Sequence, residues 1–246
     1  MPCPQSGARA LFWSNVMKQR LRAALAYFTL FEKILYLSSV VFITAAYLLF
    51  DSGSALSLIA SLVGATALIF CAKGNPIGQL LMVVFGILYA IISYSYAYYG
   101  ELITYAGMSV PMAAFSFLVW VFHPHRGNHA EVQVGHLLPR DAVILPLLAV
   151  AATVGFYFIL DAFGTANILP STLSVTTSVI AVYFSARRVP WFAFAYAIND
   201  VVLIVLWTLA AFEDISYLSV VICFVMFLFN DTYSFTNWRR IKRRQA

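Results

Sequence analysis

The sequence predicts an all-α integral membrane protein that crosses the bilayer eight times. The chain has 246 residues, of which 62% are hydrophobic and only 10% are charged, and its mean hydropathy is +0.86. A soluble domain carries about 25% charged residues, so this chain has too little polar surface to fold in water. Eight apolar segments approach the roughly 20 residues that a helix needs to cross the hydrocarbon core.

The eight expected spans follow one another along the whole chain after residue 33. The sixth of them is short and rich in Ser and Thr. The expected spans are residues 34–50, 55–72, 76–97, 101–122, 142–160, 171–186, 191–211 and 215–236.

Charged residues predict the orientation of these helices, because cytoplasmic loops collect Lys and Arg. With the N-terminus in the cytoplasm, eight spans place all 15 Lys and Arg residues on the cytoplasmic side. A different number of spans would mix the two kinds of charge, so both termini are expected in the cytoplasm. The outer connections then carry only acids: Asp51, Glu101, Asp161, Glu213 and Asp214.

Residues 1–33 are expected to form a cytoplasmic lead-in to the first span. Between residues 11 and 28 apolar side chains recur about every four residues, and Lys18 and Arg22 lie beside this stripe. The pattern is typical of an amphipathic helix at the membrane interface. A simple extension of the first span explains it equally well.

An internal repeat organises the rest of the chain. Residues 72–76 (AKGNP) resemble residues 186–190 (ARRVP), which lie 114 residues further on. This offset aligns helices two to four with helices six to eight and leaves helix five as a linker. Three helices per copy plus one linker give both copies the same orientation, and such parallel repeats hold substrate at their interface near mid-membrane.

The predicted architecture is therefore a SWEET-like 3+1+3 parallel repeat with one extra N-terminal helix. The basic C-terminal tail is typical of a segment held on the cytoplasmic side, where it attracts anionic lipid. The parts are the amphipathic lead-in (1–33), the extra N-terminal transmembrane helix (34–54), the first three-helix bundle (55–122), the cytoplasmic loop and linker helix (123–170), the second three-helix bundle (171–238) and the basic cytoplasmic tail (239–246).

Two carboxylates lie inside expected spans, Asp200 in helix seven and Asp231 in helix eight, directly after Asn199 and Asn230. A carboxylate at membrane depth costs about 2.5–3.5 kcal/mol on insertion scales, so it is usually retained for a function. Interhelical hydrogen bonding is the structural alternative. Because two acids are a costly way to join helices, the pair predicts a binding site for a polar, cationic solute.

Other polar and aromatic side chains share helix faces with these acids. Tyr196 and Trp207 recur with Asp200 at three-to-four-residue spacing on helix seven, and Tyr233 borders the corresponding stripe on helix eight. Weaker polarity occurs in the first copy. The candidate substrate-binding residues are Gln79, Tyr89, Tyr196, Asn199, Asp200, Trp207, Asn230, Asp231 and Tyr233.

Other function classes lack their sequence signals. The three cysteines have no disulfide or metal spacing, and the four histidines, all between residues 123 and 136, match no zinc-ligand pattern. No glycine-rich phosphate loop, zinc-protease motif or nucleophile elbow occurs. We therefore expect no metal, no cofactor, no catalytic residue and no nucleic-acid partner. An intramembrane enzyme that uses Asp200 and Asp231 is a different-class alternative, and a non-transporting membrane subunit is another.

Three motifs resemble the PnuC family of vitamin transporters. Residues 230–240 (NDTYSFTNWRR) are similar to the C-terminal signature of that family. Residues 72–80 (AKGNPIGQL) and 98–101 (YYGE) resemble its Gram-positive branch. The similarity extends from about residue 55 to residue 240, and Ser234 stands where members often have glycine.

This resemblance implies a bacterial inner-membrane carrier that takes up nicotinamide riboside by facilitated diffusion. It also implies that a cytoplasmic kinase traps the riboside by phosphorylation. Relatives carry thiamine or riboflavin, so both are alternative substrates. A homo-oligomer is compatible with the sequence.

The residues favour nicotinamide riboside among these vitamins. Its pyridinium ring is a flat cation, which an aromatic face such as Trp207, Tyr196 or Tyr233 attracts by roughly 0.5–2 kcal/mol. Its carboxamide needs a donor and an acceptor, which an Asn or Gln side chain supplies. Its ribose hydroxyls suit Asp200 or Asp231 as acceptors. Thiamine is also an aromatic cation, whereas riboflavin is neutral and larger.

Overall fold

The structure is a computed structural model that describes residues 26–51, 53–95, 102–165 and 167–246. Most of the expected amphipathic lead-in and the outer acid Glu101 lie outside the described residues. Within them, eight helices are long and apolar enough to cross a membrane. The predicted all-α fold with eight spans is confirmed.

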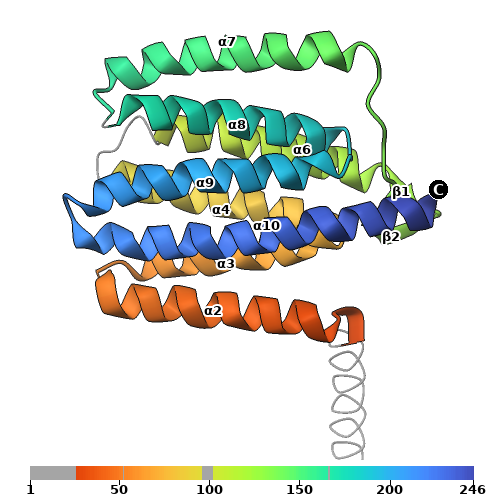
Figure 1. Ribbon diagram of the computed structural model, residues 1–246, viewed down its shortest axis with the longest axis horizontal. Helices are drawn as coiled ribbons and strands as arrows, with labels where there is room; N and C mark the ends of the chain where they lie inside the picture. Colours follow the sequence, from red (N-terminus) through yellow and green to blue (C-terminus); the bar gives the residue numbers. More distant parts are fainter. Residues whose placement is uncertain (1–25, 52, 96–101, 166) are drawn as a thin grey trace, which may run out of the picture.

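The eight spans run side by side along the long axis of the molecule (Figure 1). A short hairpin of β1 (Pro124–His125) and β2 (Asn128–Val132) lies at the end that also holds the C-terminus (Figure 1). The spans are α2 (Leu30–Phe50), α3 (Ala55–Ala72), α4 (Pro76–Ser95), η1 with α6 (Thr104–Ser109 and Val110–Val121), α7 (Asp141–Ala162), α8 (Ile168–Ala186), α9 (Trp191–Ala211) and η2 with α10 (Ile215–Tyr217 and Leu218–Gln245).

The two ends of this bundle differ in charge. Every Lys and Arg among the described residues lies at the end with the hairpin, which we call the basic end. The opposite end is the acidic end. Its described charged residues are Asp51, Asp161, Glu213 and Asp214.

Two helix ends differ from the prediction by four residues or more. The first span begins at Leu30 because Thr29 and Glu32 form a capping box, in which the Thr29 N–H donates to the Glu32 carboxylate at 2.7 Å. The last helix, α10, continues through the predicted tail to Gln245. No Gly or Pro interrupts this stretch, and its basic last turn stabilises the negative end of the helix dipole.

Six of the helices form a closed ring. In the order α3, α4, α6, α8, α9 and α10, each helix packs against the next, and α10 packs back against α3. Outside the ring, α2 packs against α3 and α10, and α7 packs against α8 (Figure 1). Large apolar side chains on α2 and α7 are exposed, which is typical of a surface that contacts lipid.

Hydrogen bonds at the basic end occur in matched pairs. The pattern S-F-x-x-W occurs at residues 116–120 and again at residues 234–238. Trp120 Nε1 donates to the Ser185 carbonyl at 2.9 Å, and Trp238 Nε1 donates to the Cys71 carbonyl at 2.8 Å. Because Cys71 and Ser185 are 114 residues apart, each tryptophan bonds to the same place in the opposite three-helix bundle. These contacts support the predicted parallel repeat.

Two matched ion pairs relate the two helices outside the ring. Lys73, which follows α3, pairs with Glu32 in the first turn of α2 at 3.2 Å. Arg187, which follows α8, pairs with Asp141 at the start of α7. The matched ion pairs make the extra N-terminal helix and the linker helix counterparts in the two copies.

The segment after β2 connects the two copies at the basic end. The Val132 N–H donates to the Gly74 carbonyl at 2.8 Å, and the Gly135 N–H donates to the Arg188 carbonyl at 2.9 Å. Gly74 and Arg188 are repeat counterparts, and both have a left-handed backbone, with φ of 68° and 57°. We call residues 132–135 the strap, because they join the α3–α4 turn to the α8–α9 turn.

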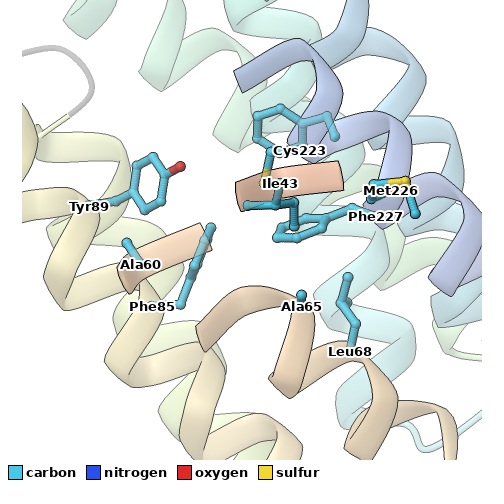
Figure 2. Close-up of a cluster of buried hydrophobic side chains, with 10 residues drawn as sticks. Ile43, Ala60, Ala65, Leu68, Phe85, Tyr89, Cys223, Met226 and Phe227 are labelled. Atoms are coloured by element: carbon cyan, nitrogen blue, oxygen red, sulfur yellow. The ribbon is translucent and has the colours of Figure 1, made fainter. Parts of the chain in front are cut away.

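A cluster of apolar side chains fills the space between α2, α3, α4 and α10 (Figure 2). The rings of Phe85 and Phe227 lie 6.0 Å apart above α3. A Cβ at Gly64 would lie 2.6 Å from Phe227, so only glycine allows the ring to approach α3 this closely. This packing fixes α10 and directs Asp231, one turn beyond Phe227, toward the interior of the ring.

Replacing Gly135 by alanine tests the strap. A Cβ at this position would lie 2.2 Å from the Arg187 carbonyl oxygen, so the strap must move and lose its bond to the α8–α9 turn. We expect the midpoint of thermal unfolding in detergent to fall by the equivalent of about 1–3 kcal/mol. Gly155→Ala is the matched control, because nothing lies within 4 Å of its Cβ position. Equal midpoints for the two variants would contradict a structural role for the strap.

Candidate functional site

The ring of six helices encloses a cavity of about 140 Å³, which we call the central cavity. Side chains of η1, α4, α6, α8, α9 and α10 form most of its wall. Asp200 and Asp231 line it near the middle of α9 and α10, and Thr165 lines it toward the acidic end. The cavity therefore extends from mid-membrane toward the acidic end.

Two buried carboxyl groups dominate the chemistry of this cavity. Asp200 and Asp231 are 4% and 3% exposed and lie within hydrogen-bonding reach of each other. Two ionised carboxylates repel each other unless a proton or a cation lies between them. Asp200 Oδ2 is buried and accepts no hydrogen bond from any described residue. Among the described residues that line the cavity there is no Lys or Arg, so none of them gives the pair a positive partner.

Further predicted residues on α9 also face the cavity. Tyr196, Asn199 and Trp207 line it together with Asp200, as their three-to-four-residue spacing predicts. Asn199 Oδ1 accepts from Thr177 Oγ1 at 2.7 Å, which fixes the amide against α8. The indole Nε1 of Trp207 is buried and has no acceptor among the described residues.

Four predicted residues lie elsewhere. Tyr89 lines a second cavity at the acidic end, and Gln79 Nε2 donates to Ser185 Oγ at 3.2 Å on the basic side of the acids. Asn230 and Tyr233 face away from the central cavity. Asn230 Nδ2 donates to Ser39 Oγ of α2 at 2.9 Å, and Tyr233 Oη donates to Glu32 Oε1 at 2.8 Å. Both side chains join α10 to α2, so we leave them out of the proposed site.

The sequence prediction missed part of the wall. Ser171, Ser174 and Ser178 of α8 line the cavity, and their three-to-four-residue spacing in a Ser-rich span was the available signal. Thr104 and Ser109 also line it, from the π-helical segment η1. Pro111 lies two residues after this segment and has no N–H, which disturbs the α-helical hydrogen bonds ahead of it.

Aromatic side chains close the ring on the basic side of the acids. Trp120, Phe192 and Trp238 are each about fully buried, and the ring of Trp238 lies 5.2 Å from Trp120 and 4.8 Å from Phe192. The indole N–H groups of the two tryptophans donate to backbone carbonyls of the opposite bundle. A solute in the central cavity therefore meets a closed, aromatic layer between it and the basic end.

Comparison with known proteins identifies the family. The sequence profile described as nicotinamide mononucleotide transporter matches residues 54–240. The chain belongs to the nicotinamide mononucleotide transporter family. Members of this family are membrane transporters, so the intramembrane-enzyme alternative is set aside.

Two relatives of this transporter agree with the assignment. The chain is 26% identical over 208 residues to the nicotinamide riboside transporter PnuC of Neisseria mucosa, covering 83% of this chain and 79% of that protein. It also matches the crystal structure of the vitamin B3 transporter PnuC with a TM-score of 0.75 at 24% identity, covering 89% of this chain and 94% of that chain. The second match shows the fold.

The neighbouring residues Asn230 and Asp231 of this transporter predict opposite effects on stability. Asn230→Ala removes two buried hydrogen bonds, to Ser39 and to the Met226 carbonyl, so we expect a loss of about 1–3 kcal/mol in unfolding free energy. Asp231→Asn removes one of two adjacent buried acids without removing volume, so thermal stability in the absence of ligand should stay equal or rise. Thermal unfolding in detergent measures both. A larger loss for Asp231→Asn would contradict the placement of these side chains.

Proposed function

We propose that the protein takes up nicotinamide riboside by facilitated diffusion across the bacterial inner membrane. The observation that carries this proposal is the pair of buried acids in a cavity whose described lining contains no Lys or Arg. A cationic ligand compensates this negative charge. The sorting of Lys and Arg to one end supports a cytoplasmic position for the basic end and for both termini.

The cavity wall suits each part of nicotinamide riboside. Its pyridinium carries the positive charge that Asp200 and Asp231 lack, and Tyr196 and Trp207 offer aromatic faces for a flat cation. The buried Trp207 Nε1 is a free donor for a carboxamide or hydroxyl oxygen. Hydroxyl groups of α8 and η1 surround the remaining polar surface, which suits a ribose.

The charge of the cavity favours the riboside over the mononucleotide. The two ligands differ by a phosphate, and a phosphate monoester carries about −1.5 to −2 charges at pH 7. Phosphate sites in proteins rely on Arg or Lys, and the described lining contains neither. Two buried acids would instead repel the phosphate. The same property explains trapping, because a riboside phosphorylated in the cytoplasm could not return through this cavity.

Thiamine and riboflavin are the alternative substrates. Thiamine is also an aromatic cation and satisfies the acid pair. Riboflavin is neutral, so it leaves the buried negative charge uncompensated. A cavity of about 140 Å³ is small beside typical small-molecule pockets of roughly 300–1,000 Å³, which disfavours riboflavin as the largest of the three vitamins.

The described conformation suggests how transport proceeds. The aromatic layer closes the basic end, while the cavity extends toward the acidic end. The cavity is smaller than its substrate requires, so binding needs the two bundles to move apart. Rocking of the bundles about the acid pair would then break the crossed tryptophan bonds and open the basic end. No ion gradient is needed for such an exchange.

Purified protein in liposomes tests the proposed function. Labelled nicotinamide riboside should equilibrate across the bilayer without ATP or an ion gradient, and it should be recovered unaltered. Nicotinamide mononucleotide should be excluded. A thermal-shift comparison with thiamine and riboflavin ranks the alternatives. Uptake of the mononucleotide at the rate of the riboside, or no riboside uptake, would refute the proposal.

Neutralising Asp200 tests the role of charge in binding. We expect Asp200→Asn to weaken nicotinamide riboside binding by the equivalent of about 1.5–3 kcal/mol. The uncharged reduced form, dihydronicotinamide riboside, has the same ribose and carboxamide and should lose much less affinity. Isothermal titration of both ligands to both proteins gives the comparison. Equal losses for the two ligands would remove the ion-pair role of Asp200.

A further inference from the structure

A second cavity of about 240 Å³ lies at the acidic end, between α2, α3, α4, η2 and α10. We call it the outer vestibule. Its wall contains carboxylates, tyrosines and serines, and its described lining includes no Lys or Arg. The proposed function uses only the central cavity and leaves this second cavity without a role.

Two acids give the outer vestibule a negative charge. Asp51 follows the last residue of α2, and Asp214 caps η2 through its bond from the Ser216 N–H at 2.9 Å. Burial raises the pKa of Asp51, a bond from the Gly53 N–H opposes this rise, and the negative charge of Asp214 adds to it. Both carboxylates line the same cavity. Like charges held near each other attract a cation between them.

Aromatic side chains form the walls around these acids. Tyr47, Tyr89 and Tyr217 all line the vestibule. The ring of Tyr217 lies 5.3 Å from the ring of Trp207 at an angle of 42°. Aromatic faces next to carboxylates are the combination that binds a flat organic cation.

Trp207 belongs to both cavities. It lines the outer vestibule and the central cavity, so its indole forms part of the partition between them. The ring of Tyr89 on the vestibule side lies 4.7 Å from the ring of Phe85 on the central side and extends the same partition. The buried Trp207 Nε1 has no acceptor among the described residues, so a donor stands free at this partition.

We propose that the outer vestibule is a first binding site for a flat aromatic cation, which then passes Trp207 to reach Asp200 and Asp231. This inference rests on the proposed function for the identity of the cation, and on the geometry of the two cavities for the order of binding. Asp51 and Asp214 raise the local concentration of the cation at the acidic end. The free indole N–H of Trp207 donates to the carboxamide oxygen as the ligand crosses the partition.

The test compares two double variants that remove the same charge from the acidic end. Asp51→Asn/Asp214→Asn neutralises the vestibule, and asparagine keeps the capping ability of position 214. Asp161→Asn/Glu213→Gln is the matched control, since neither residue lines the vestibule. Stopped-flow tryptophan fluorescence measures the association rate of nicotinamide riboside. Association should slow about tenfold at low salt in the vestibule variant and by less than about twofold in the control.

The outcomes separate the vestibule from the proposed function. Equal slowing in both double variants, or no slowing in either, would overturn the vestibule site. The liposome uptake experiment tests the identity of the substrate independently of this result. 1-Methylnicotinamide, a flat cation without ribose, is the second probe. If the wild-type protein binds this probe and only the vestibule variant fails to bind it, the vestibule is supported as a binding site even if the riboside does not bind. Binding of this probe at equal affinity to all three proteins would overturn it.

Discussion

Two acids that meet in the middle of a membrane protein set the condition for the rest of this structure. Asp200 and Asp231 are buried together, and no described Lys or Arg lines their cavity. Burying an uncompensated charge is expensive, so such a site is stable only with a proton, a cation or water beside it. The closed ring of six helices supplies the enclosed space in which a ligand does this. In the proposed function, a cationic vitamin supplies the positive charge that the described lining of this cavity lacks.

The repeat explains how this space is closed at one end. Trp120 and Trp238 exchange hydrogen bonds between the bundles, and the strap joins counterpart turns across the same interface. Because both copies have the same orientation, each contact occurs twice at the basic end. In the proposed rocking motion, opening that end would break both tryptophan bonds together, which favours two discrete states over a gradual change.

Much of this fold could be predicted from composition, and part of the site could not. Span count and charge sorting follow from hydropathy, and the α9 stripe of Asp200 and Trp207 faces the cavity as its spacing predicts. Helical spacing predicts which residues share one face of a helix, but it does not predict which neighbouring helix or cavity that face contacts. Asn230 therefore shares the turn of Asp231 and yet contacts α2. The extension of α10 depends on a distant partner, since Gln245 accepts from the Val134 N–H. Such contacts exist only in three dimensions.

A structure of the protein with bound nicotinamide riboside tests the central claim most directly. We expect the pyridinium ring in the central cavity, with its charge within about 4–6 Å of the Asp200 and Asp231 carboxylates and its face toward Tyr196 or Trp207. A riboside held outside the ring of six helices, with both carboxylates in contact with protein groups alone, would contradict it.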